Sequence, residues 1–380
     1  MYASYVPNLR FPEFQGEWNS FLINDICSEF KSGKNIKADS ISESGEYPVY
    51  GGNGLRGYTS SYNHEGLYVL IGRQGALCGN VRSVNGKTYI TEHAIAVAGN
   101  EKSNTSFLHY LFLKMNLGQF SDQSAQPGLA VNKLLKLKVI LPSISEQTKI
   151  ARLLSLLDER IATQNKVIDK LQSLIKGLNN YFYQQYGNDV ETSFSDLGYS
   201  YSGLSGKSAT DFGSGKPFIT YLNVYSNAVI DETSYQYVRI GNKEKQNVVR
   251  YGDVLFTLSS ETPEEVGIGS VYLGNEEVYL NSFCFGIHIT KAQKAFSPYM
   301  SYYISTSQFR KFIYPFAQGS TRFNLCKADF EKATIKLPTL ENQKQFYKSL
   351  KTLSDKIALE ESALNQYYNQ KQYLLRQMFI

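Results

Sequence analysis

The sequence has little cysteine and little histidine, and this argues against several kinds of site. Its four cysteines are scattered over 380 residues without a C-x-x-C pair, so neither a zinc ribbon nor a disulfide framework is predicted. The four histidines show no metal-ligand spacing and no H-E-x-x-H motif, which argues against a zinc hydrolase. Unpaired cysteines are typical of a reducing compartment, so we expect a cytoplasmic protein.

Long apolar runs are also missing. No run approaches the roughly 18 apolar residues of a membrane-spanning helix, and the N-terminus lacks the charged and apolar regions of a signal peptide. We therefore expect a soluble, non-exported chain with no membrane partner. The net charge of +5 is too small for a non-specific nucleic-acid binder, so any polyanion must contact a local patch.

Motifs of catalysis or nucleotide binding are incomplete. Gly52–Gly57 fits the pattern G-x-G-x-x-G, but Tyr58–Tyr62 follows it and does not begin a helix. Gly206–Ser208 resembles the end of a phosphate-binding loop, yet Tyr201 stands where that loop needs glycine. The D/N-P-P-Y/F tetrapeptide of amino-methyltransferases is absent, as is a compact acid–acid–lysine nuclease cluster. We expect that the chain itself performs no catalysis.

Two stretches, 145–183 and 341–379, carry the strongest periodicity. Each follows a Leu-Pro pair, Leu141-Pro142 or Leu337-Pro338, which is typical of a helix start. Apolar residues then recur at alternating steps of four and three, the pattern of a coiled-coil seam. The first seam consists of Ile150, Leu154, Leu157, Ile161, Gln164, Ile168, Leu171, Ile175, Leu178 and Phe182. We therefore predict two long helices.

The two stretches are repeats of one another. An offset of 196 residues converts the first seam into Phe346, Leu350, Leu353, Ile357, Glu360, Leu364, Tyr367, Lys371, Leu374 and Met378. This match predicts an internal duplication and two helices that pack together. The equivalent polar residues Gln164 and Glu360 favour an antiparallel pairing in which they meet and set the register. Alternatively, both lie at a solvent-exposed crossing.

The segments outside these helices are predicted to be globular. Each contains short β-like runs punctuated by Gly and Asn, with a later helical stretch. Val81–Thr91 aligns with Val271–Asn281 at an offset of 190 residues. The predicted fold is α+β, with two mixed α/β domains separated by two long antiparallel coiled-coil-like helices in a pseudo-twofold arrangement. The predicted parts are an N-terminal segment (1–20), domain 1 (21–140), spacer helix 1 (141–183), domain 2 (184–337) and spacer helix 2 (338–380).

Several motifs together resemble the specificity (S) subunits of type I restriction–modification systems. They are Pro7–Phe14 with Trp18, the loops Tyr47–Tyr58 and Gly72–Asn80, and the helix frames that contain Glu146-Gln147 and Asn342-Gln343. The resemblance covers essentially the whole chain. One departure is that domain 2 lacks the Gly-Gly-Asn-Gly and Gly-Arg-Gln-Gly loops of domain 1, so its contacts cannot be copied from domain 1.

The resemblance implies a non-catalytic DNA-binding subunit. In this family, two target-recognition domains each read one half of a bipartite double-stranded DNA site, and the paired helices set the unread gap. Two methyltransferase (M) subunits dock on the helices, and restriction/translocase (R) subunits join them. S-adenosylmethionine, ATP and Mg then belong to the partners. Two other functions stay open, a self-contained methyltransferase or nuclease with degenerate motifs and a coiled-coil adaptor with two protein-binding heads.

Candidate DNA contacts in domain 1 follow from residue type and loop position. Arginine can bind guanine bidentately, asparagine and glutamine can bind adenine, and tyrosine offers a ring and a hydroxyl. These candidates are Tyr50, Asn53, Arg56, Tyr58, Arg73, Gln74 and His93. Alternatively, the tyrosines pack under strands, Arg73 forms a structural pair, and His93 is a core histidine.

Candidates in domain 2 rest on residue type alone. Basic residues there are expected to hold phosphates, which positions a protein on DNA without specifying sequence. The candidates are Lys207, Lys216, Thr220, Asn223, Ser259, Ser260 and Arg322.

Overall fold

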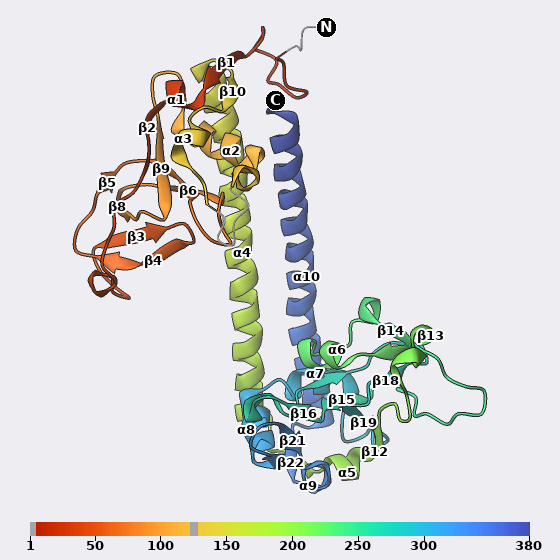
Figure 1. Ribbon diagram of the computed structural model, residues 1–380. Coiled ribbons are helices and arrows are strands. Elements are labelled where there is room, and N and C mark those ends of the chain that lie inside the picture. The colour runs from red at the N-terminus through yellow and green to blue at the C-terminus, as the bar shows by residue number, and fades with distance from the viewer. Residues whose placement is uncertain (1–4, 122–127) are drawn as a thin grey trace. The chain divides into compact units, whose positions relative to one another are not determined.

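The computed structural model describes residues 5–121 and 128–380 (Figure 1). The chain forms two compact units, one of Met1–Asn165 with Ser362–Ile380 and the other of Lys166–Glu361. The long helices α4 (Ile144–Tyr186) and α10 (Leu340–Gln377) each contribute a segment to both units. Each unit therefore contains one globular domain together with part of both helices.

The first unit contains two four-stranded sheets and one two-stranded pair. Its elements before α4 are β1 (Asn19–Leu22), α1 (Ile23–Ile26), β2 (Cys27–Ser32), β3 (Tyr47–Gly51), β4 (Gly54–Thr59), β5 (His64–Glu65), β6 (Tyr68–Gly72), β7 (Val81–Val84), β8 (Lys87–Ile90), β9 (Ala94–Gly99), α2 (Thr105–Met115), α3 (Val131–Leu134) and β10 (Lys138–Leu141). One sheet has the strand order β2-β9-β6-β7 and the other β4-β3-β8-β5. The pair β1–β10 is antiparallel and leads into α4.

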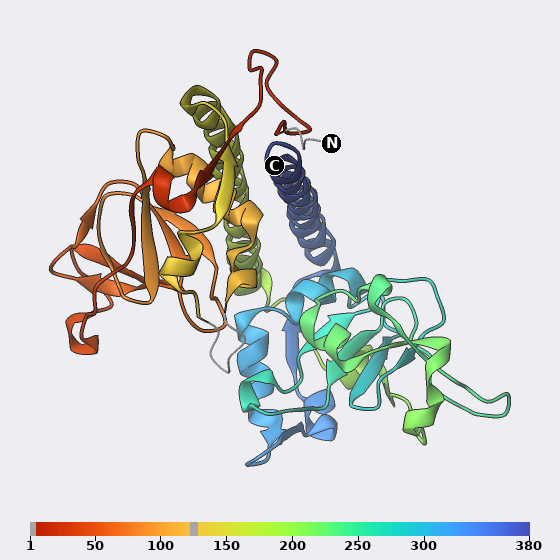
Figure 2. The same ribbon diagram turned by 45° about the horizontal axis from the view of Figure 1, so that its top comes forward.

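The strand β9 contributes side chains to two separate hydrophobic clusters of the first unit. Because side chains alternate across a strand, Ile95 and Val97 join the cluster that contains α2 and α4, whereas Ala94 and Ala96 join a smaller cluster on the other face. The helix α2 packs on the sheet β2-β9-β6-β7 and belongs to the same cluster as α4 (Figure 2). Asn104 caps α2 by accepting the amide of the third residue of the helix.

The second unit repeats this plan. Its elements are β11 (Val190–Thr192), α5 (Phe194–Leu197), β12 (Gly198–Ser202), β13 (Phe212–Ile219), α6 (Tyr221–Ser226), β14 (Gln236–Val238), β15 (Val254–Thr257), β16 (Ser259–Ser260), β17 (Gly269–Val271), β18 (Tyr279–Leu280), β19 (Cys284–Ile289), α7 (Ser297–Tyr303), α8 (Ser307–Ile313), β20 (Ala317–Gln318), β21 (Phe323–Leu325), α9 (Lys327–Lys332) and β22 (Ile335–Leu337). Its larger sheet, β12-β19-β15-β17, matches β2-β9-β6-β7 strand for strand, and β14-β13-β18 matches β4-β3-β8. The predicted α+β fold with an internal repeat is confirmed.

One glutamine in each unit attaches the globular domain to its helix by the same three hydrogen bonds. In the first unit, Gln147 accepts the amide of Asn104 at 2.8 Å and donates to the carbonyls of Lys102 and Pro142 at 3.0 and 2.9 Å. Gln147 and its counterpart Gln343 are fully buried, so their side-chain amide groups need hydrogen-bond partners within the protein.

In the second unit, Gln343 takes the place of Gln147. It accepts the amide of Phe296 at 2.8 Å and donates to the carbonyls of Lys294 and Pro338 at 2.9 and 2.8 Å. The offset between the two glutamines is the 196 residues of the helix repeat.

The predicted helical seam is present in both units. All twenty seam positions are buried or half-buried. In the first unit, Lys371 of α10 pairs with Asp158 of α4, and in the second Phe346 of α10 stacks on Phe182 of α4 with ring centroids 4.1 Å apart. From Asp158 to Phe182 the residue number on α4 rises, whereas from Lys371 to Phe346 the number of the contacting residue on α10 falls. The two helices therefore run antiparallel. None of the helices in the described ranges is long and apolar enough to cross a membrane.

The predicted meeting of Gln164 and Glu360 stays a prediction. Both side chains are half-buried, but Gln164 belongs to the first unit and Glu360 to the second.

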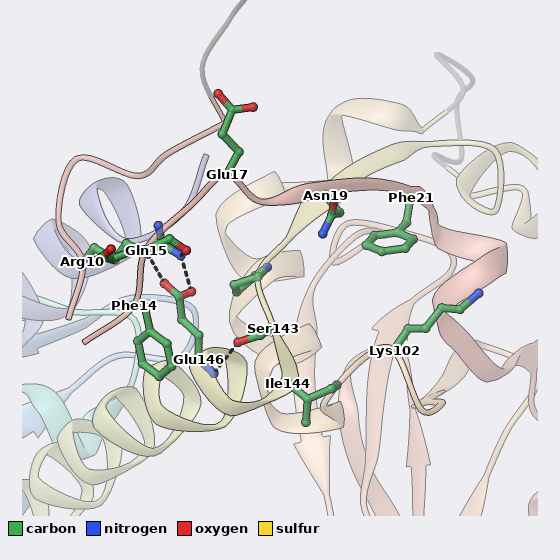
Figure 3. Close-up of a pocket in the computed structure, with 11 residues that line it drawn as sticks. Arg10, Phe14, Gln15, Glu17, Asn19, Phe21, Lys102, Ser143, Ile144 and Glu146 are labelled. Carbon is green, nitrogen blue, oxygen red and sulfur yellow. Dashed lines mark hydrogen bonds and ion pairs between the residues drawn. The ribbon is translucent and has the colours of Figure 1, made fainter. Parts of the chain in front are cut away.

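The segment before β1 folds over the start of α4. Arg10 donates two hydrogen bonds, both 2.7 Å long, to the carboxylate of Glu146, which is only 1% exposed (Figure 3). The backbone amide of Leu9 also donates to the carbonyl of Gln377 at the end of α10. The N-terminal motif noted in the sequence therefore ties together the ends of both helices within the first unit.

Candidate nucleic-acid interface

The hairpin of β3 and β4 places the glycine-rich loop of the first unit. A bulge between Val49 and Tyr50 bends the hairpin, and Gly54 has a φ of +106°, which favours glycine. A Cβ atom on Gly51 would lie 2.9 Å from Cδ of Arg56. Glycine at position 51 thus leaves room for the stem of Arg56 to cross the strand.

Four of the seven domain 1 candidates converge on one pocket. It has a volume of about 320 Å³ and is lined by Gly51, Gly52, Asn53, Arg56, Gln74 and His93. These residues come from the β3–β4 hairpin, the segment after β6 and the segment between β8 and β9 (Figure 1). The pocket combines a guanidinium group, two amides and an imidazole around a glycine floor.

The imidazole of His93 contacts neighbouring side chains, and the polar side chains that line this pocket remain exposed to solvent. His93 Nδ1 lies 3.2 Å from Oε1 of Gln74, and its Nε2 lies 3.1 Å from Oε1 of Glu92. Asn53, Arg56, Gln74 and His93 are all exposed. Such an arrangement can donate and accept hydrogen bonds at base edges.

The other three domain 1 candidates lie elsewhere. Tyr50 packs its ring against the small cluster under the hairpin, as in the alternative interpretation. Tyr58 lines a different hollow that also contains Asp39 and Glu46, where the carboxylates disfavour a polyanion. Arg73 is half-buried, and its backbone amide donates to the carbonyl of His93 at 2.9 Å.

Backbone hydrogen bonds identify the matching surface in the second unit. The amide of Leu258 donates to the carbonyl of Phe283 at 2.8 Å, as the amide of Arg73 does to that of His93. Phe283 therefore occupies the place of His93.

A second pair of bonds extends the match. The carbonyl of Tyr50 accepts the amide of Thr91 at 2.9 Å, and the carbonyl of Ile219 accepts the amide of Asn281 at 3.0 Å. Since Ile219 corresponds to Tyr50, α6 begins where the first unit has its tight glycine turn. The two units thus present different groups at the same place in the topology.

Several domain 2 candidates are already bonded within the protein. The side chain of Lys207 is only 8% exposed, and its amine nitrogen lies 2.6 Å from Oε2 of Glu244. The hydrogen bond from Lys207 is the main cause that lowers the pKa of Glu244 to about 2. This amine is already neutralised, which argues against a phosphate contact.

Asn223, Ser259 and Ser260 are buried. Asn223 accepts the amide of Asp231 at 3.0 Å and donates to its carbonyl at 2.9 Å. Ser260 donates to Oε2 of Glu265 at 2.9 Å. Asn223 and Ser260 are thus bonded within the protein, and the burial of all three residues argues against contact with DNA.

The remaining domain 2 candidates reach the surface to different degrees. Thr220 is half-buried and caps α6 by accepting the amide of Asn223 at 3.2 Å. Lys216 is exposed beside a bulge in β13. Arg322 is exposed, and its guanidinium carbon lies 5.8 Å from the ring centroid of Phe283.

Sequence reasoning missed Phe283 and Arg82. Phe283 lies two residues beyond the repeat Val271–Asn281, so extending the offset of 190 residues would have paired it with His93. The exposed Arg82 on β7 lies against Gly54, where a Cβ would be 2.7 Å from its Nη1 atom. No local pattern marks Arg82, because the contact depends on the bend of the hairpin.

A duplicated α+β domain carried by two long antiparallel helices is a fold found in type I specificity subunits. The S subunit from M. genitalium is similar with a TM-score of 0.65 and 16% identity, covering 99% of both chains. A chain from a structure describing complex assembly and conformational transition of the type I R-M system has a TM-score of 0.58 and 16% identity, covering 97% of this chain and 98% of that one.

Sequence comparison assigns the family. The model of the type I restriction modification DNA specificity domain matches residues 15–173 and 203–367, and the chain belongs to this family. The type I restriction enzyme EcoprrI specificity subunit of Escherichia coli is 43% identical over 154 residues, which cover 40% of this chain and 38% of that protein. A protein of Haemophilus influenzae is 29% identical over 144 residues, 37% of each chain. The chain thus spans under two fifths of each of these relatives' length.

Proposed function

We propose that the chain is a DNA-reading specificity subunit that recognises a bipartite site and does not itself catalyse a reaction. The observation that carries this proposal is the repeated plan of the two units. They share a sheet order and the same glutamine attachment to their helices, yet they differ at the equivalent loops. Two modules that are attached alike but differ in their loops suit the reading of two different short sequences.

Domain 1 is proposed to read its half-site with Asn53, Arg56, Gln74 and His93. Arg56 suits a guanine, whose N7 and O6 accept two hydrogen bonds, and the two amides suit adenine. The glycine floor lets the backbone approach the base edges closely. Arg82, on the strand next to β6, is proposed to contact phosphate, which adds affinity without sequence preference.

The helices α4 and α10 are proposed to set the distance between the half-sites. At 1.5 Å per residue, the 43 residues of α4 extend roughly 64 Å. Half-sites on one face of B-DNA repeat about every 34 Å. An insertion of seven residues in both helices, which preserves the seam, is expected to lengthen the unread gap and keep both half-site sequences. A methylation motif with changed half-sites and an unchanged gap would argue against this role.

Catalysis is proposed to reside in partner subunits. Two methyltransferase subunits would dock on the helices, and restriction/translocase subunits would join the complex. S-adenosylmethionine, ATP and Mg are accordingly assigned to the partners. Purified chain without partners is then expected neither to methylate nor to cut DNA.

The experiment that tests this function is methylome sequencing of the source cell with and without the gene for this chain. We expect one bipartite methylated motif that disappears with the chain. In the same assay Arg56→Ala is expected to relax one base position in one half of the motif. Arg250→Ala, at an exposed arginine outside both long helices and outside the candidate contacts, serves as the matched control and should leave the motif unchanged. A methylome unaffected by loss of the chain would refute the proposal.

A further inference from the structure

We propose, on the basis of the function proposed above, that Phe283 and Arg322 form the base-reading element of domain 2. The half-site of domain 2 would then contain a thymine whose methyl group packs on Phe283, together with a guanine within reach of Arg322. This assignment replaces the bonded Lys207 and Asn223 by a pair of residues that the fold leaves exposed.

The position of Phe283 supports this assignment. Its carbonyl accepts the amide of Leu258 as that of His93 accepts the amide of Arg73. Phe283 therefore occupies the place of a residue that lines the polar pocket of domain 1. If equivalent positions in the two domains face the two halves of one duplex, Phe283 faces DNA.

The exposure of Phe283 points to a binding partner. Phe283 is 55% exposed, although its backbone is fixed by the bond to Leu258 and by a 2.9 Å bond from its amide to Oδ1 of Asn281. A phenylalanine held outward on a rigid turn gains free energy when a partner covers it. The ring cannot donate or accept a conventional hydrogen bond, so its partner at a base edge is an apolar group. In the major groove that group is the methyl of thymine.

Arg322 adds a charged partner to this ring. Its guanidinium carbon lies 5.8 Å from the ring centroid, within the range of a cation–π contact. The planar guanidinium group has the fork geometry that matches N7 and O6 of guanine. Since Arg322 is exposed and its guanidinium lies at the ring of Phe283, the two side chains can contact neighbouring base pairs.

The turn that forms the pocket of domain 1 is replaced in domain 2. Tyr221, at the start of α6, stands where domain 1 has Gly52, and its hydroxyl donates to the carbonyl of Ser259 at 2.7 Å. Domain 2 therefore has an aromatic side chain at the position where domain 1 has a glycine, at which a Cβ atom would lie 2.7 Å from the carbonyl oxygen of His93. This difference favours contact by a protruding apolar surface in domain 2 over contact by a polar pocket.

The test uses the full chain assembled with its methyltransferase subunits and duplexes that carry the motif found by methylome sequencing. In the half-site that Arg56→Ala does not relax, each thymine is replaced in turn by deoxyuridine, which removes only the methyl group. At one position the wild-type complex is expected to bind about fourfold more weakly, the effect of one buried methyl. Phe283→Ala is expected to bind both duplexes equally. Arg322→Ala is expected to lose roughly tenfold discrimination for a guanine in that half-site.

The matched control is Tyr251→Ala. Tyr251 is 59% exposed and lies before the start of β15, whereas Leu258, which holds Phe283, follows the end of that strand. Loss of the Tyr251 side chain should therefore leave the discrimination against deoxyuridine intact. Phe283→Leu retains an apolar side chain and should keep part of that discrimination.

Three results would overturn the assignment. They are a second half-site without thymine, unchanged deoxyuridine discrimination by Phe283→Ala, and relaxation by Arg322→Ala in the half-site that Arg56 reads. A wild-type complex with no sequence preference would instead refute the proposed function itself.

Discussion

Nζ of Lys371 lies 2.5 Å from Oδ1 of Asp158, which joins α10 to α4 within the first unit. Tyr110 of α2 donates its hydroxyl to the other oxygen of the same carboxylate at 2.9 Å. In the second unit, the equivalent residues Tyr302 and Ser354 form an uncharged hydrogen bond of 2.9 Å. The same place in the repeat therefore carries charge in only one unit.

Replacement of Lys371 by alanine should destabilise the first unit. The half-buried Asp158 would lose its cation, and the free energy of unfolding is expected to fall by about 1–2 kcal/mol. Urea denaturation measures the change in the free energy of unfolding, and hydrogen exchange of the α2 amides shows whether it falls on the first unit. Lys351→Ala, which removes an exposed ion pair with Asp355, should cost less than about 0.5 kcal/mol. Equal losses for the two variants would contradict a special role for Lys371.

Replacement of Arg10 by alanine should have a larger effect. Glu146 would remain buried without its partner, which costs about 3–5 kcal/mol for a buried pair. Glu146→Gln in the Arg10→Ala background is expected to restore part of the stability, because an amide needs less solvation than a carboxylate. Thermal unfolding measures both variants. Lys149→Ala, which breaks the exposed pair with Glu13, is the control, and failure of rescue would show that Arg10 acts by packing alone.

An isosteric change from glutamine to glutamate tests the attachment of the domains. In Gln147→Glu, a carboxylate oxygen would face the carbonyls of Lys102 and Pro142, which now accept hydrogen bonds. The loss is expected to be about 3 kcal/mol or more, since the buried donors vanish and a charge is buried. Gln343→Glu should cost a similar amount in the second unit. Gln184→Glu, at an exposed position of α4, should leave stability unchanged.

The stability of the first unit should depend on pH through His109. Burial lowers the pKa of His109 to about 4, Lys371 acts in the same direction, and Asp158 opposes them. The unfolded chain then binds the proton more readily than the folded one. The contribution is complete above pH 6.5 and is lost as the pH falls towards 4, a change of roughly 3 kcal/mol.

The acid dependence can be assigned with two variants. His109→Gln removes the titrating group and should flatten the dependence of unfolding free energy on pH between 6.5 and 4. The exposed His93→Gln should leave it as in the wild type. An identical slope in wild type and His109→Gln would assign the acid sensitivity to other groups.

The long helices and their seam could be predicted from sequence because periodicity is a local property of the chain. The offset of 196 residues even locates Ser354 as the counterpart of Asp158. Lys371 in the seam gives no local signal, since its ion pair forms only when α10 meets α4.

The candidate interface was predicted in part. Residue type indicates Asn53, Arg56, Gln74 and His93, and the fold brings these four side chains together. Lys207 had equally suitable chemistry, but Glu244 lies 37 positions further along the chain and neutralises it. Residue type indicates what a side chain can bind, whereas only the tertiary structure shows whether that capacity is already used.

The attachment of both domains through Gln147 and Gln343 has a consequence for divergence. Within the described residues, the hydrogen bonds from each glutamine side chain to its domain join it to main-chain amide and carbonyl groups, and every amino acid except proline supplies both groups. Side chains of each domain can therefore change without removing the hydrogen bonds that join it to its helix.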